Sequence, residues 1–142
     1  MNIEWTDDLI IGVDIIDEQH KEFFRRINLL FQSIETNDLK EIARTFLFVR
    51  QYVNIHFKTE EDFIKNNINY EYGITNYIEH KNDHDAFIRD FTEFEKIKIK
   101  NKREILKIAK EFYPWMRNWL SQHITCIDKK MGIIYNKSME KK

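Results

Sequence analysis

Cysteine, proline and glycine are all scarce in this chain of 142 residues, which has one cysteine, one proline and three glycines. A single cysteine, Cys126, excludes an internal disulfide framework and is typical of a reducing compartment. With so few turn-forming residues, we expect long helices joined by short connections. Apolar residues make up 42% of the chain, which is enough for a real core, and we expect residues 1–142 to form one domain.

Neither an excess of charge nor a long apolar run is present. Lys and Arg total 23 against 24 for Asp and Glu, which leaves a formal charge of −1. That balance gives no electrostatic reason to expect nucleic acid or a membrane surface as a partner. The N-terminus is acidic and lacks the apolar core of a signal peptide, and no stretch approaches the length of a membrane span. We therefore expect a cytoplasmic protein. The sequence does not identify a protein partner.

The first half of the chain predicts an arm and two helices. We expect residues 1–16 to form an extended arm that is anchored by Trp5. Apolar residues then recur at helical spacing, and Asp17 is a typical N-cap for the first helix. Asp38 and Glu41 have the spacing of a capping box, so a second helix is expected to begin there.

The second half predicts two more helices. Its expected parts are the longest loop at residues 66–73, a third helix from near Thr75 to about Lys98, a fourth helix that begins at Asn101, and a frayed tail over residues 131–142. Pro114 falls inside the fourth helix, where we expect a kink or a restart. Short connections make sequential helices antiparallel, which predicts an all-α, up-down-up-down four-helix bundle over residues 17–130.

All five histidines and two acidic residues fall on the apolar faces of these helices. The candidate metal ligands are His20, His56, Glu60, His80, His84, His123 and Asp128. His56 with Glu60, and His80 with His84, are four residues apart, which places each pair on one face of a helix at about 6 Å. Because sequential helices alternate in direction, all seven side chains are expected at one end of the bundle. A lone histidine on such a face is more often a core residue, but seven groups at one level indicate a metal site.

The chemistry of this set limits the kind of site. Imidazoles and carboxylates without thiolates are suited to iron, zinc, copper or manganese. Structural zinc requires four ligands, and seven are too many for one ion. Two six-coordinate ions, bridged by both carboxylates and a shared oxygen atom, use the whole set and leave one position open to a small ligand. A ferritin-like site requires glutamate three residues before histidine, and no histidine here has one.

The spacing of these residues closely resembles that of the hemerythrin family in its stand-alone bacterial form. The resemblance runs from Trp5 to Asp128 and includes Asp17-x-Gln19-His20, His56-x-x-x-Glu60, His80-x-x-x-His84 and His123-x-x-x-x-Asp128. It implies two non-haem iron ions with a bridging oxo or hydroxo group, and it implies the up-down bundle as well. The implied assignment is His80, His84 and His123 for one iron, His20 and His56 for the other, and Glu60 and Asp128 as bridges.

The resemblance also implies a function, which is reversible dioxygen binding for transport, storage or delivery, without enzyme activity. The implied oxygen pocket is lined by Phe57, Trp119, Leu120 and Ile124. Such apolar side chains exclude the water and protons that would leave the irons oxidised. The alternatives are enzyme-like handling of peroxide or nitric oxide, and a sensor of iron or oxygen. We interpret Cys126 as a small buried residue, with a redox-sensitive thiol as the alternative.

Overall fold

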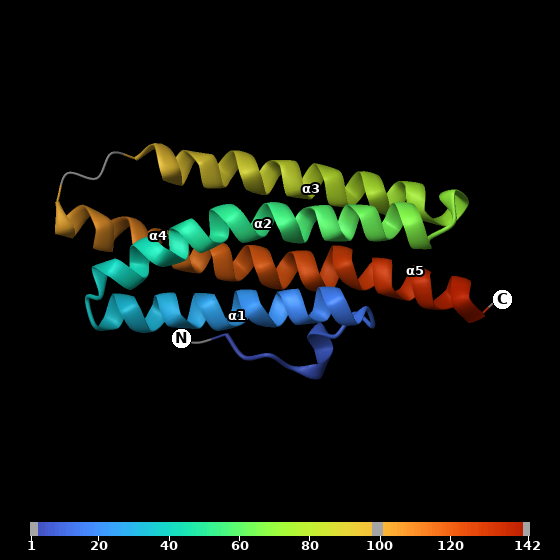
Figure 1. The fold of residues 1–142 in the computed structure, drawn as a ribbon, viewed down its shortest axis with the longest axis horizontal. Helices are drawn as coiled ribbons and strands as arrows, with labels where there is room; N and C mark the ends of the chain where they lie inside the picture. Colours follow the sequence, from blue (N-terminus) through green and yellow to red (C-terminus); the bar gives the residue numbers. More distant parts are fainter. Residues whose placement is uncertain (1–2, 98–100, 141–142) are drawn as a thin grey trace.

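Four long helices lie side by side in the computed structural model, which describes residues 3–97 and 101–140 (Figure 1). They are α1 (Asp14–Glu35), α2 (Leu39–Asn67), α3 (Tyr70–Lys96) and α4 (Lys102–Gln122). A short π-helix, η2 (His123–Asp128), follows α4 directly and leads into α5 (Lys129–Glu140), so these three elements form one continuous rod. Sequential helices run in opposite directions, which confirms the predicted all-α, up-down-up-down bundle.

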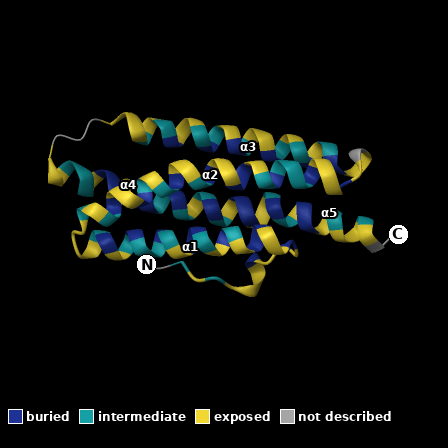
Figure 2. Cartoon of the chain, viewed as in Figure 1, coloured by how far each residue is buried: buried dark blue, intermediate teal, exposed yellow. Residues whose placement is uncertain are grey.

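Each helix buries one face toward the centre of the bundle and exposes the other (Figure 2). Phe23, Ile27 and Leu30 on α1 are at most 1% exposed, and so are Phe112 and Met116 on α4. Their spacing of three or four residues places them on one stripe of each helix. Burial of each such side chain stabilises the fold by about 1.5–3 kcal/mol. Within the described ranges, every helix is too short or too polar to span a lipid bilayer.

Two side-chain caps set helix starts where the sequence predicted them. The carboxylate of Asp38 accepts the backbone N–H of Glu41 at 3.2 Å at the start of α2. The side chain of Asn101 accepts the backbone N–H of Glu104 at 3.1 Å at the start of α4. Each cap satisfies a donor that has no partner inside the first helical turn.

The predicted loop at residues 66–73 is wrong, because only Ile68 and Asn69 separate α2 from α3. The side chain of Asn69 accepts the backbone N–H of Glu71 at 3.3 Å, so a residue that indicated a turn caps a helix instead. Gly73 lies inside α3, where an added Cβ would lie 2.9 Å from a methyl group of Ile68. The third helix therefore starts before Thr75. It ends at Lys96, and residues 98–100 of the expected basic turn lie outside the described residues.

The fourth helix differs from the prediction at two places. It continues through Pro114 from Lys102 to Gln122, so the predicted restart does not occur. The expected tail at residues 131–142 is wrong as far as residue 140, because α5 continues the rod. Met131 is fully buried, and the ring of Tyr135 packs edge-on against Phe63 with centroids 4.8 Å apart. Met131 and Tyr135 are four residues apart and so lie on one face of the helix. The many lysines around them made the segment look like a frayed tail.

The N-terminal arm is shorter than predicted, because α1 begins at Asp14, and it contains a 3₁₀ turn, η1 (Asp7–Leu9). Asp17 is not the N-cap. Its carboxylate instead accepts the backbone N–H groups of Ile11 at 2.9 Å and Gly12 at 3.2 Å, which fixes the end of the arm against α1. Trp5 anchors the arm as expected, since its ring lies edge-on to Phe24 at 5.4 Å.

Gly132 allows this arm to approach α5. An added Cβ at position 132 would lie 1.9 Å from the carbonyl oxygen of Ile11. Replacing glycine by alanine inside a helix ordinarily adds about 1 kcal/mol of stability. Here Gly132→Ala is expected to lower the free energy of unfolding by about 1–3 kcal/mol, because the arm must move away. Urea unfolding followed by circular dichroism measures the change.

A shortened chain provides the control for this substitution. Deletion of residues 1–12 removes the carbonyl of Ile11, so Gly132→Ala is expected to stabilise that chain. If the substitution stabilises the full chain as well, the arm does not press against α5.

Candidate metal centre

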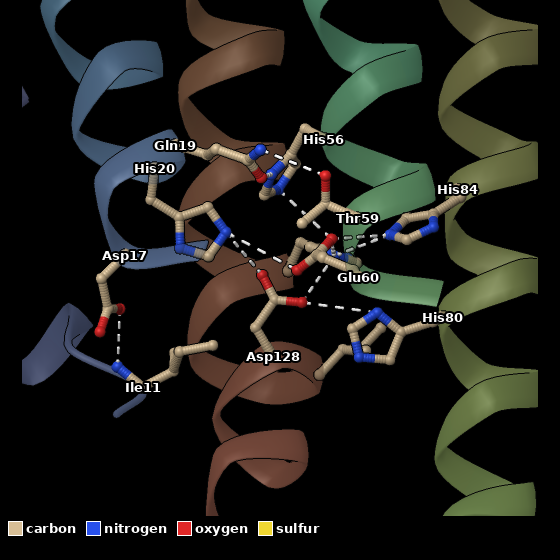
Figure 3. A network of polar contacts seen from close by, with 12 residues as sticks. Ile11, Asp17, Gln19, His20, His56, Thr59, Glu60, His80, His84 and Asp128 are labelled. Atoms are coloured by element: carbon tan, nitrogen blue, oxygen red, sulfur yellow. Dashed lines mark hydrogen bonds and ion pairs between the residues drawn. The ribbon is translucent and has the colours of Figure 1, made fainter. Parts of the chain in front are cut away.

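All seven predicted ligands meet at one level of the bundle. Figure 3 labels each of them except His123. They are His20 on α1, His56 and Glu60 on α2, His80 and His84 on α3, and His123 and Asp128 on η2. None of them is more than 2% exposed. The start of α1, the end of α2, the start of α3 and the end of α4 lie at the same end of the bundle, as the alternation of helix direction predicted.

The ligand atoms form two groups that share Glu60. In each group, one nitrogen or oxygen atom from every residue lies within 4.8 Å of the others. The first group, which we call the three-histidine group, is Glu60, His80, His84 and His123. The second, the two-histidine group, is His20, His56, Glu60 and Asp128. This division has the same histidines on each side as the assignment that the family resemblance implied.

Both carboxylates face histidines of both groups. Oε1 of Glu60 lies 3.0 Å from Nε2 of His84 and 3.3 Å from Nε2 of His56. Asp128 also contacts both groups. Its Oδ2 lies 2.9 Å from Nε2 of His20, and its Oδ1 lies 3.0 Å from Nε2 of His123. Two carboxylates between two sets of imidazoles have the arrangement that bridging ligands require.

Several of these buried polar atoms have no hydrogen-bond partner among the described residues. They are both ring nitrogens of His20 and of His80, Oε2 of Glu60 and both carboxylate oxygens of Asp128. Some of them, such as Oδ2 of Asp128 and Nε2 of His20 at 2.9 Å, lie at ion-pair distance but without hydrogen-bond geometry. Each unsatisfied buried group of this kind costs about 1–3 kcal/mol. Nitrogen and oxygen lone pairs directed at a common point are satisfied by cations, so the residues fit a metal centre.

The π-helix η2 gives Asp128 its place in the site. In an α-helix, five residues turn through about 500°, which would leave Asp128 about 140° away from the direction of His123. The backbone N–H of Lys129 instead reaches the carbonyl of Ile124, five residues back, which widens the turn. The side chain of Asn76 on α3, itself buried, donates to the carbonyl of Ile127 at 3.4 Å. The sequence spacing predicted that the two ligands meet, but not the π-helix that brings them together.

Three further side chains hold the outer nitrogen of a histidine. Nδ1 of His56 pairs with Oε1 of Gln19 at 2.8 Å, and Nδ1 of His84 with Oε2 of Glu61 at 2.8 Å. Nδ1 of His123 pairs with Oδ2 of Asp83 at 2.5 Å. Such partners fix the orientation of a ligating imidazole and direct its other nitrogen inward. Gln19 belongs to the predicted Asp17-x-Gln19-His20 motif, whereas Glu61 and Asp83 were not predicted. Their only signal is their place one residue after Glu60 and one before His84.

Burial and charge shift the pKa values of the histidines in different directions. Burial lowers the pKa of His56 to about 3, so its ring is neutral at neutral pH. Burial also lowers the pKa of His20, but the carboxylates of Asp128 and Glu60 outweigh it and raise the pKa to about 9. Burial would raise the pKa of the Glu60 carboxyl, yet the electrostatic effect of His56 and contacts with Asp128, His123 and His20 hold it well below its usual range. In the absence of a metal, protons balance the charge of the buried carboxylates.

Aromatic rings cover the centre from the sides. Phe57 is stacked on His84 with ring centroids 3.8 Å apart, and Trp119 is stacked on His123 at 4.5 Å. Phe23 lies edge-on to His56 at 5.2 Å and is a neighbour of the two-histidine group that the sequence analysis treated as core.

The remaining predicted pocket residues and the cysteine lie on opposite faces of the rod. Leu120 and Ile124 are at most 1% exposed. The interpretation of Cys126 as a buried residue is wrong, because η2 directs its thiol outward and leaves it exposed. The inward positions of the same turn are taken by the ligands His123 and Asp128.

Metal binding to this centre is expected to release protons. The pKa of His20 is raised to about 9, and nearby carboxylates, Asp128 first, raise the pKa of His123 despite its burial. Both rings are therefore protonated on both nitrogens and positively charged near neutral pH in the metal-free protein, whereas an imidazole must lose one of these protons to bind a metal. Anaerobic titration with Co²⁺ should release protons near neutral pH, and the affinity should rise as the pH increases toward 9. Calorimetry in buffers of different ionisation enthalpy counts the protons. Binding without proton release would show that both rings are already neutral.

Comparison with known proteins agrees with this geometry. The sequence model described as Hemerythrin HHE cation binding domain matches residues 11–132. A bacteriohemerythrin of Clostridium acetobutylicum is 26% identical over 124 residues, which cover 84% of this chain and 91% of that protein. A bacteriohemerythrin of Methylococcus capsulatus is 28% identical over 121 residues, which cover 85% of this chain and 86% of the relative. The match to the family model spans most of the chain and includes all seven candidate ligands, so this chain belongs to the hemerythrin family.

Proposed function

We propose that this protein binds dioxygen reversibly at a non-haem di-iron centre, as a carrier, store or delivery protein and not as an enzyme. The observation that carries the proposal is the pair of buried ligand groups that share Glu60, in a chain of the hemerythrin family. Relatives that cover most of this chain are named bacteriohemerythrins.

The two groups define which residues would hold each ion. The proposed ligands are His80, His84 and His123 for one iron, His20 and His56 for the other, and Glu60 and Asp128 as bridges together with an oxo or hydroxo group. The ion in the two-histidine group has fewer protein ligands, so it keeps the position that a small molecule can take. A pair of ferrous ions supplies the electrons and the open coordination position that reversible dioxygen binding requires.

The protein around the centre would keep water and protons away from it. Leu120 and Ile124 are buried beside the ligands of η2, and Phe57 and Trp119 cover the imidazoles of His84 and His123. Dry, apolar walls suppress the side reactions that oxidise a metal centre irreversibly. Gln19 holds the ring of His56 through Nδ1, and Thr59 in turn accepts from Gln19 at 3.2 Å. The ring is thus fixed before any ligand arrives.

An optical experiment tests the proposal. The iron-loaded protein is reduced without oxygen, exposed to dioxygen and then flushed with inert gas. Reversible binding predicts a visible absorption band that appears with dioxygen and disappears when it is removed, over repeated cycles. Rapid oxidation in one cycle, with no reversible band, would contradict the carrier function and favour enzyme-like handling of peroxide or nitric oxide.

Leu120 tests the dry wall. Leu120→Asn places an amide in a position that is 1% exposed, where it can hold water near the centre. Autoxidation of the oxygenated protein is expected to be at least several-fold faster, as measured by the decay of the visible band. Leu47→Asn is the matched control, because Leu47 is 57% exposed and α2 directs it outward. Equal decay rates in the two variants and the unmodified protein would mean that Leu120 does not protect the centre.

A further inference from the structure

The two ligand groups differ in what lies behind their histidines. In the three-histidine group, the outer nitrogen of His84 pairs with the Glu61 carboxylate and that of His123 with the Asp83 carboxylate. In the two-histidine group, the outer nitrogen of His56 pairs with the neutral amide of Gln19. The other imidazole of that group, His20, has no hydrogen-bond partner at Nδ1 within the described part of the chain. His80, the third imidazole of the three-histidine group, has no hydrogen-bond partner at either ring nitrogen among the described residues. Where an outer partner is present, it is thus anionic on one side of the centre and neutral on the other.

A carboxylate and an amide have different effects on a metal-binding imidazole. The oxygen of either group accepts a hydrogen bond from Nδ1–H and so fixes the orientation of the ring. A carboxylate also draws that proton toward itself, which makes the imidazole a stronger donor to the metal. A stronger donor with a negative charge behind it stabilises the more highly charged oxidation state of the ion. The reduction potential of that ion therefore falls, whereas an amide in the same place has only the orienting effect.

Both carboxylates are partly exposed to solvent. Glu61 has 15% of its side chain exposed, and its second oxygen lies 3.7 Å from Nζ of Lys81. Asp83 has 31% of its side chain exposed. Each thus has contact with solvent on one side and with a buried ring on the other, so neither is a fully desolvated ion. Glu61 and His84 together line a surface cavity of about 230 Å³.

We propose that Glu61 and Asp83 are positioning residues that give the two halves of the centre different reduction potentials. They make the ion in the three-histidine group the more readily oxidised of the two. The inference rests on the proposed di-iron function. The ion bound by three imidazoles would thus be the better electron donor. It would lie next to the ion that keeps an open coordination position. Gln19, by remaining neutral, keeps the potential of the two-histidine ion higher.

Charge-neutral variants test the proposal with little change in shape. Glu61→Gln and Asp83→Asn retain an oxygen that accepts the Nδ1 proton but remove the negative charge. Spectroelectrochemistry resolves the two one-electron steps of the centre. The step at lower potential is expected to move upward in each variant and further in the double variant, while the other step moves less. Gln19→Glu is the reciprocal change, and it should lower the step at higher potential and narrow the gap.

Asp85→Asn is the matched control. Asp85 lines the same surface cavity, and its carboxylate lies 3.4 Å from Nζ of Lys81, but no histidine of the described ranges pairs with it. The Asp85→Asn substitution removes the same charge at a similar place. It therefore reports only the long-range effect of that charge on the reduction potentials. A shift in Glu61→Gln or Asp83→Asn no larger than in Asp85→Asn, or an equal shift of both steps, would overturn the proposal.

Metal content separates this inference from the proposed function. Iron per chain is measured first, and fewer than two ions in the unmodified protein would overturn both. A second readout needs no redox chemistry. Glu61→Leu removes the acceptor itself and is expected to weaken Co²⁺ binding at one of the two positions by about 10–100-fold, with the other retained. Two bound ions with unchanged affinities and potentials would leave the di-iron function standing and the inference refuted.

Discussion

Two fully buried carboxylates, Glu60 and Asp128, are the constraint on which this end of the bundle depends. Removing a carboxylate from water costs several kcal/mol even after the protein relaxes, so neither group is tolerated there without positive charge around it. Five imidazoles, which come from α1, α2, α3 and η2, surround these two carboxylates. Without a metal that charge is supplied by protons, and with a metal by the ions themselves. The same carboxylates thus account for the shifted pKa values, the unsatisfied buried atoms and the fit to a pair of cations.

The bundle has two ends of different character. At the end far from the ligands, aromatic rings fill the interior, and Phe46 lies against Phe112 with centroids 4.6 Å apart. Such apolar packing stabilises the helices without a bound metal ion. At the ligand end, the interior is occupied by imidazoles and carboxylates, and the arm and α5 add cover there. Stability at that end is therefore coupled to what the centre holds, while the aromatic end supports the helices independently.

Local departures from regular structure serve the centre. The π-helix η2 turns Asp128 toward His123, and Asn76 satisfies the carbonyl that this wider turn exposes. Asp17, which the sequence suggested as a cap, instead holds the arm through two backbone N–H groups. Each departure exchanges a local preference for a contact with a different part of the chain, as is common where a site is built.

Local sequence patterns are enough to predict the four helices, their alternating direction and the level at which the ligands meet. These follow from local periodicity, from caps such as Asp38 and Asn101, and from a spacing of four residues, none of which depends on distant contacts. Three other features depend on contacts in the folded protein: the short connection at Asn69, the helix after Asp128 and the carboxylates behind the histidines. Glu61 lies 23 residues from His84 in sequence, and Asp83 lies 40 from His123. Such pairs are set by how helices pack across the bundle, and the order of residues along the chain does not show which partly exposed carboxylate faces which ring.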